Sequence, residues 1–297
     1  MVKFRKPVQR SGDLVDRRGA PGRRGGIAIG AGGGGLAIII AILFAVLGGG
    51  GGGLEDIIGQ LQPPPQSAEE APLDPSVDPQ ADLVDFLSVV LDDNQAMWEE
   101  IFIQSDRQYR RAQLVLFEEA TASGCGGAHA GVGPHYCPLD DTIYMDLGFF
   151  EVLASRFGAA GDLAPAYVLS HEIAHHVQNV LGVSEQVRDM QQANPAQAND
   201  LSVRLELQAD CYAGVWASTV FVGELQTGED LALDPGEIAE ALEAAAAVGD
   251  DRIQETSQGR SDPETFTHGT SEQRQRWFQT GYETGNPAAC DTFSGDV

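Results

Sequence analysis

The sequence predicts an α+β domain that is mostly helical. Several long stretches within residues 82–297 have apolar residues at helical spacing, whereas only two short runs are rich in β-branched and aromatic residues. These helices and strands do not alternate one for one, as they would around a parallel α/β sheet. Hydrophobic residues make up 42% of the 297-residue chain and charged residues 21%, so a domain of this size can build its own core.

Three segments are expected before this domain. Residues 1–26 form a basic head with eight Lys and Arg side chains against two Asp, and residues 27–47 are uncharged and long enough for one transmembrane helix. Residues 48–81 are a tether, rich first in glycine and then in proline and acids. The positive-inside rule predicts a single-pass protein of the cell membrane, with a cytoplasmic N-terminus and an extracytoplasmic domain. A cleavable signal sequence is the alternative, which the passage of the apolar run into glycines disfavours.

The elements of the domain follow from local patterns. Apolar residues at helical spacing predict a first helix over Leu83–Phe102. Two short runs rich in β-branched and aromatic residues predict strands at Gln113–Phe117 and Thr142–Met145. Four further helices are expected, over residues 149–157, 162 or 164 to 181, 200–220 and 235–248. Gly158, Gly182 and Gly249 follow the first, second and fourth of these helices, where glycine is common.

The charge of the chain excludes one class of partner. The formal net charge is −26, and because the head is positive, the rest of the chain is more acidic still. Such a surface repels the phosphates of nucleic acids and of anionic lipids, so a role in DNA or RNA binding is excluded.

The four cysteines all follow the apolar segment. In an oxidising compartment an even number of cysteines is expected to be paired. Cys125 and Cys137 bracket a glycine-rich loop, which favours a disulfide between them and leaves Cys211 to pair with Cys290. The sequence contains no C-x-x-C motif, which argues against a structural zinc ribbon.

A motif for metal binding lies in the predicted helix that ends at residue 181. His171 and His175 stand four residues apart, so both imidazoles project from one helical face and can bind one ion. Glu172 lies about 100° around the helix, where it can reach a water on the metal without being a ligand. His176 is expected to form hydrogen bonds within the fold. The alternative is a structural helix face, which would have to bury three consecutive ionisable groups among apolar neighbours.

The third ligand of a catalytic zinc site is expected on the following helix. Glu206 and Asp210 stand four residues apart and share a face of that helix. Glu206 is the candidate ligand, and Asp210 is expected to accept a hydrogen bond from a liganding imidazole and to fix its tautomer. The alternative is a solvated acidic pair, which the apolar residues around it disfavour.

These motifs resemble those of gluzincin-type metallopeptidases. The chain is similar to the bacterial putative neutral zinc metallopeptidase family over about Asp82–Phe293, and its basic head with one membrane helix is similar too. The resemblance implies a zincin-like metallopeptidase domain behind one N-terminal transmembrane helix, with His171, His175 and Glu206 as zinc ligands and Glu172 as catalytic base. It rests on the stretches SGCGGAHAGVGPHYCPLDDTIYMDLGFF, VLSHEIAHHVQNVLGV, SVRLELQADCYAGVWA and FTHGTSEQRQRWFQTGY.

The expected activity is hydrolysis of a peptide or protein substrate by a zinc-bound water, with Glu172 as general base. A second donor is needed for the oxyanion; His268 is the first catalytic candidate, followed by Tyr136 and Tyr144. The substrate is expected to align along an exposed edge strand such as Thr142–Met145.

Two other functions remain compatible with the sequence. One is a membrane-tethered binding or scaffold protein whose zinc site is structural and catalytically idle. The other is a zinc hydrolase that cleaves a non-peptide bond, such as an amide of the cell wall. Replacement of Glu172 tests the first, because a structural site needs ligands but no base.

Overall fold

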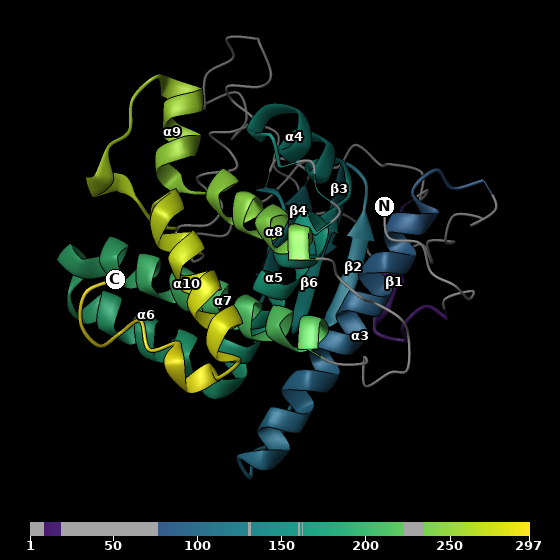
Figure 1. The fold of residues 1–297 in the computed structure, drawn as a ribbon, viewed down its shortest axis with the longest axis horizontal. Coiled ribbons are helices and arrows are strands. Elements are labelled where there is room, and N and C mark those ends of the chain that lie inside the picture. Colours follow the sequence, from purple (N-terminus) through teal and green to yellow (C-terminus); the bar gives the residue numbers. More distant parts are fainter. Residues whose placement is uncertain (1–8, 19–76, 130–131, 160, 162, 223–234) are drawn as a thin grey trace.

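The computed structural model describes residues 9–18, 77–129, 132–159, 161, 163–222 and 235–297 (Figure 1). Helices dominate this part of the chain, and the strands are short, as the predicted mostly helical class requires. The strands are β1 (Leu14–Asp16), β2 (Gln113–Phe117), β3 (Ala120–Ser123), β4 (Gly126–His129), β5 (His135–Cys137) and β6 (Thr142–Asp146). The helices are α3 (Ala81–Gln104), α4 (Gly148–Phe157), α5 (Ala164–Leu181), α6 (Val183–Ala193), α7 (Ala198–Val222), α8 (Pro235–Ala247), α9 (Asp250–Gln258) and α10 (Ser271–Thr284), with short 3-10 turns η2 (Pro195–Gln197), η3 (Pro263–Thr265) and η4 (Pro287–Ala289).

The main sheet has the strand order β1-β2-β6-β5. β1, β2 and β6 run parallel, and β5 is antiparallel to β6. The predicted strands at 113–117 and 142–145 are therefore confirmed. The expectation that Thr142–Met145 is an exposed edge strand is wrong, because β6 lies between β2 and β5. β5 borders β6 on that side, and its three residues are too few to show a strand pattern in the sequence.

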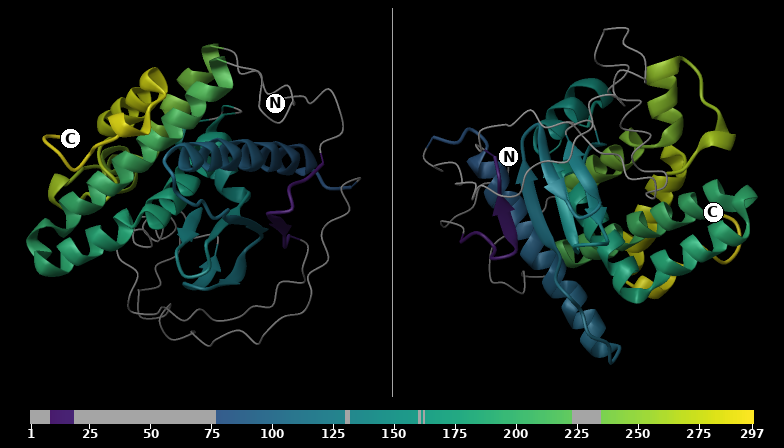
Figure 2. Two further views of the ribbon diagram at one scale, coloured as in Figure 1. Left: turned by 90° about the horizontal axis from the view of Figure 1, so that it is seen from below. Right: turned by 180° about the vertical axis from the view of Figure 1, so that it is seen from behind.

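Both faces of the sheet are covered. Leu116 and Met145 face a core that α3 and α5 contribute to, and Figure 2 shows α3 running along the sheet. Val115 and Tyr144 point to the opposite face, where they pack with Ala128 of the β3–β4 hairpin. A strand segment that is buried on both faces is apolar at every position, which is why Leu114–Phe117 of β2, after the exposed Gln113, is an unbroken hydrophobic run.

The helices form a second layer around α5. This helix has Pro165 in its first turn and ends at Gly182, whose φ of 80° satisfies the left-handed C-terminal position. α7 packs against α5, and α10 packs against α7. The contact between α7 and α10 is close because a Cβ at Gly214 would overlap the carbonyl of Phe278, and one at Gly281 would overlap the carbonyl of Cys211. This close approach places α10 beside the residues that α7 contributes to the metal site.

Part of the predicted basic head packs on the domain. The sequence assigns residues 1–26 to a separate segment, but β1 within it pairs with β2, and the backbone N–H of Ser11 donates to Ser88 Oγ of α3 at 2.7 Å. The guanidinium of Arg18 is buried, with Nη2 at 2.7 Å from an oxygen of Asp16 and 2.6 Å from one of Asp78.

The predicted transmembrane segment, residues 27–47, and most of the tether lie outside the described residues. Within the part of the chain that the structure describes, no helix combines the length and the apolar character that crossing a membrane requires.

Both predicted disulfides are present. Cys125, in the turn between β3 and β4, is joined to Cys137, the last residue of β5, and Cys211 of α7 is joined to Cys290 after η4. The second bridge ties the C-terminal segment to the helix that carries Glu206 and Asp210.

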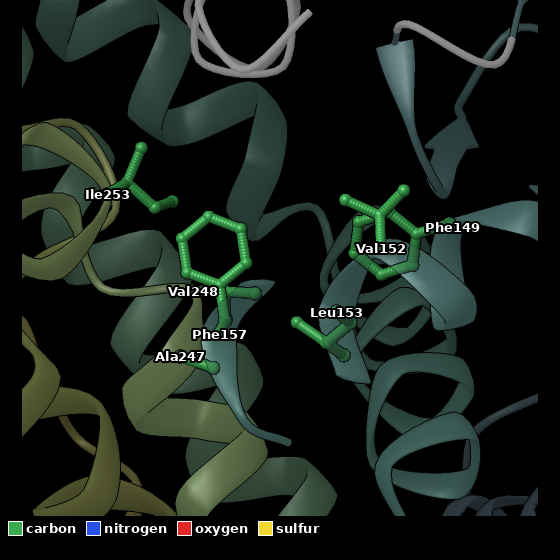
Figure 3. Close-up of a pocket in the computed structure, with 7 residues that line it drawn as sticks. All are labelled: Phe149, Val152, Leu153, Phe157, Ala247, Val248 and Ile253. Carbon is green, nitrogen blue, oxygen red and sulfur yellow. The ribbon is translucent and has the colours of Figure 1, made fainter. Parts of the chain in front are cut away.

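An apolar pocket lies where α4, α8 and α9 meet (Figure 3). It has no polar side chain among its lining residues, so it is part of the packing of these helices and not a site for chemistry. The lining residues are Phe149, Val152, Leu153, Phe157, Ala247, Val248 and Ile253.

Candidate metal centre

Three buried side chains converge between α5 and α7. His171 Nε2 lies 3.1 Å from Glu206 Oε2, His175 Nε2 lies 3.4 Å from Glu206 Oε1, and the two Nε2 atoms are 3.1 Å apart. Nitrogen and oxygen ligands at about 2.0 Å from a tetrahedral zinc ion are about 3.3 Å apart. The spacing and the chemistry of these donors therefore fit one zinc ion, and they form the cluster of potential ligands found among the described residues.

The three donors perturb one another's pKa values. Burial lowers the pKa of His171, but Asp210 and Glu206 outweigh burial and raise it to about 9. Burial raises the pKa of Glu206, but His175, His268 and His171 together lower it well below its usual value. Without a metal ion, the site therefore holds an ionised Glu206 beside a His171 that retains its proton at neutral pH, and a metal ion has to displace that proton in order to bind.

Asp210 lies where the sequence predicts it, behind His171. Its Oδ1 is 2.9 Å from His171 Nδ1, which leaves Nε2 of that imidazole directed at Glu206 and His175. Burial raises the pKa of Asp210, but Arg274 and His171 lower it, so the carboxylate stays ionised. Arg274 of α10 was not predicted from the sequence.

His175 is held in the same way by a residue of its own helix. Gln178 Oε1 lies 2.9 Å from His175 Nδ1, and Gln178 Nε2 donates to the carbonyl of Leu205 at 2.7 Å. This bond also connects α5 to the turn of α7 that carries Glu206. Sequence reasoning missed Gln178, although its position three residues after His175 on one helix face is a detectable signal.

Glu172 is buried next to the cluster, with 4% of its surface exposed. Its Oε2 has no hydrogen-bond partner among the described residues. A buried carboxylate oxygen without a partner is costly, so natural proteins keep one mainly where function requires it. Glu172 Oε2 is therefore available to accept a hydrogen bond from a water molecule.

His268 lies on the loop before α10 and is also buried. Asp250 Oδ2 accepts hydrogen bonds from the backbone N–H groups of Thr267, His268 and Gly269 at 2.7, 2.7 and 3.2 Å. The Oδ1 of Asp250 lies 3.4 Å from His268 Nδ1. The loop packs on α7, since a Cβ at Gly269 would lie 3.2 Å from Leu207 Cδ2, and the charge of His268 contributes to the lowered pKa of Glu206.

The hydroxyls of Tyr136 and Tyr144 are engaged elsewhere. Tyr136 OH donates to Asp141, and Tyr144 OH donates to Asp140, both at 2.8 Å. His176 Nδ1 is 3.0 Å from Tyr136 OH, so its expected role within the fold is confirmed. Tyr136 serves this network beside α5, and Tyr144 points to the opposite face of the sheet, which leaves His268 as the better candidate for an oxyanion donor.

Two histidines one turn apart and a glutamate from the next long helix form the two-histidine, one-glutamate donor set of catalytic zinc sites. The chain belongs to the family described as "Putative neutral zinc metallopeptidase", whose model matches residues 3–293. It is 43% identical over 244 residues to "Uncharacterized protein YpfJ" of Escherichia coli (strain K12), an alignment that covers 82% of each chain. It is 49% identical over 190 residues to "Uncharacterized protein Mb2605" of Mycobacterium bovis, covering 63% of this chain and 64% of the relative. No solved structure matches the chain.

Proposed function

We propose that the protein is a zinc-dependent metallopeptidase in which His171, His175 and Glu206 hold the ion and Glu172 is the general base. One observation carries the proposal: three buried donors at zinc-ligand spacing lie beside a buried Glu172 whose Oε2 has no partner among the described residues. The family to which the chain belongs supports both the metal and the class of reaction.

The chemistry divides among these residues. Zinc, when bound, supplies a Lewis acid that polarises the scissile carbonyl and acidifies a water molecule. Glu172 accepts the proton of the attacking water and delivers it to the amine nitrogen as the peptide C–N bond breaks. His268, oriented by Asp250, donates a hydrogen bond to the carbonyl oxygen as negative charge develops there.

The proposal extends to the fold and to the substrate. A mixed sheet beside a helix that carries both histidines, with the third ligand on the next long helix, supports a zincin-like fold for residues 82–297. A peptide substrate pairs in extended form with the edge strand β5, the mode in which main-chain hydrogen bonds give affinity.

We place the domain outside the cytoplasm and attached to a membrane through residues 27–47. Two disulfides in a chain whose four cysteines are all paired support an oxidising compartment. The uncharged length of residues 27–47 supports the attachment.

The test uses the full chain and three substitutions. Glu172→Gln is expected to retain one zinc ion and to lose cleavage of a peptide library, because the amide cannot accept the proton. Glu206→Gln is expected to lose the zinc. Glu185→Gln, at an exposed position of α6, is the matched control and is expected to match the parent in both measurements.

The outcomes separate the possible functions. If the parent and Glu172→Gln both bind zinc and neither cleaves the peptides, the site is an idle structural one or the substrate is not a peptide. Cleavage by Glu172→Gln at the parent's rate would refute the role of the base. A parent chain that binds no zinc would refute the metal site itself.

A further inference from the structure

A buried arginine lies directly behind the metal cluster. Arg274, the fourth residue of α10, has 3% of its surface exposed. Its Nε donates to Asp210 Oδ2 at 2.7 Å and its Nη2 donates to Asp210 Oδ1 at 2.9 Å, so the guanidinium binds both oxygens of the carboxylate. Its Nη1 donates to the carbonyl of Val248 at 3.1 Å. This bidentate geometry fixes the plane of the carboxylate as well as its position.

The same carboxylate holds a proposed zinc ligand. Asp210 Oδ1 also lies 2.9 Å from His171 Nδ1 and 2.5 Å from the hydroxyl of Tyr167. Nη2 of Arg274 donates to the same hydroxyl at 3.2 Å. Tyr167, Asp210 and Arg274 are all buried, so water does not compete for these bonds.

The charges explain why an arginine is needed in this place. Asp210 is fully buried. Once His171 has given up a proton to bind the ion, this carboxylate would face only a neutral imidazole and a phenol if Arg274 were absent, and it would lack a compensating charge. Arg274 provides that charge, and its hydrogen bonds prevent the carboxylate from rotating away from His171. The imidazole therefore keeps its N–H on Nδ1, and its Nε2 stays directed at Glu206 and His175.

We propose that Arg274 is a positioning residue of the metal centre, which acts through Asp210 to orient His171 for the ion. The inference rests on the proposed function, because it assumes that His171 is a zinc ligand. Arg274 touches neither the ion nor the substrate in this role. It fixes the tautomer of the His171 imidazole and the direction in which Nε2 of that imidazole points.

The experiment compares zinc affinity and the absorption spectrum of the cobalt-substituted full chain for three variants. Arg274→Gln removes both the positive charge and the two parallel hydrogen bonds to Asp210. It is expected to weaken zinc binding about 10- to 100-fold and to shift the absorption bands of the bound cobalt. Arg274→Lys keeps the positive charge but cannot form both parallel hydrogen bonds to Asp210, so an intermediate loss of zinc affinity is expected. Arg252→Gln, which removes the bond from Arg252 to Glu243 away from the metal cluster, is the control and is expected to match the parent.

A purely structural role predicts a different pattern. It would lower the free energy of unfolding of the metal-free protein in Arg274→Gln while the folded variant kept the zinc affinity and cobalt spectrum of the parent, and this result would overturn the proposal. If neither variant of Arg274 folds, the residue belongs to the core and the proposal is likewise overturned. The role of Arg274 is tested by zinc affinity and not by cleavage. A parent chain that binds zinc but cleaves no peptide would therefore refute the proposed peptidase activity and leave the role of Arg274 open to this test.

Discussion

The pKa of His171 determines the pH range in which the centre binds metal. Burial lowers this pKa, but Asp210 and Glu206 outweigh burial and raise it to about 9. A proton and a metal ion compete for Nε2, so we expect zinc affinity to rise as the pH increases toward about 9. Competition with a chelator, measured at steps from about pH 6 to 10, tests this expectation, and a flat profile over that range would contradict it.

The metal-free protein should show the opposite dependence in its stability. Because the pKa of His171 is higher in the folded state than its ordinary value of 6.5, protonated His171 stabilises the fold below about pH 6.5. That contribution is lost as the pH rises through about 9. Thermal unfolding of the chelated protein over the same pH steps is the control for the zinc measurement, since the two curves should move in opposite directions.

Single residues of the site differ in how well the sequence predicts them. His171 and His175 lie on one helix at a spacing of four, as do Glu206 and Asp210, so each pair can be recognised without knowledge of the fold. Arg274 could not be found in this way, because it meets Asp210 only where α10 packs on α7, 64 positions earlier in the chain. The proposed zinc ligands are thus predictable from local periodicity, whereas the residue proposed to orient His171 depends on tertiary packing.

At the scale of elements, the contact between α7 and α10 limits what the centre tolerates. Gly281→Ala would place a methyl group on the carbonyl of Cys211 and force the two helices apart. We expect the free energy of unfolding to fall by about 1–3 kcal/mol, and zinc affinity to fall as well, because α10 also carries Arg274. Denaturant unfolding and zinc titration of the variant measure the two effects.

The control for this substitution is Gly12→Ala. A Cβ at Gly12 would have no atom within 4 Å, so the added methyl group should leave both stability and zinc binding unchanged. Parent-like zinc affinity in a destabilised Gly281→Ala variant would show that the position of α10 does not affect the centre.

The elements that the sequence predicts are those with a long or strongly apolar pattern. α5 and α7 are long and largely apolar, and four of the five residues of β2 form an apolar run. β1, β5 and the β3–β4 hairpin have three or four residues per strand, too few for a period to be recognised. α10 is largely polar and its start is marked by a capping box between Thr270 and Gln273, a signal that does not depend on hydrophobic pattern.

At the scale of the whole molecule, the layers bring distant segments to one place. The hairpin and α3 enclose the sheet, α5 lies against it with both histidines, and α7 and α10 close the far side of α5 (Figure 1). The candidate centre therefore lies where α5, α7 and the loop before α10 meet. Two of its outer supports, Arg274 and Asp250, come from the last third of the chain, whereas Gln178 comes from α5 itself.

The same layering bears on how the chain is placed at a membrane. A single crossing by residues 27–47 would put the segment before them and the domain after them on opposite sides. In the structure, β1 is part of the sheet, and the buried Arg18 binds both Asp16 and Asp78. A strand pair and a buried ion pair require their partners in one compartment. We therefore expect residues 9–18 to lie on the same side of the membrane as the domain, in place of the cytoplasmic N-terminus that charge alone predicts.

Labelling of single added cysteines in the full chain tests this topology. Gln9→Cys, before residues 27–47, and Gln186→Cys, in the domain, replace exposed side chains. Because the four native cysteines form two disulfides, the parent chain is an unlabelled control. A membrane-impermeant maleimide should label both variants in intact cells, since β1 shares the compartment of the sheet that it extends. Labelling of both variants only after the cells are opened would contradict the placement of the domain outside the cytoplasm. The opposite result is that Gln186→Cys is labelled in intact cells while Gln9→Cys is labelled only after lysis. That result would contradict the pairing of β1 with β2 in the membrane-attached protein and would support a single membrane crossing by residues 27–47.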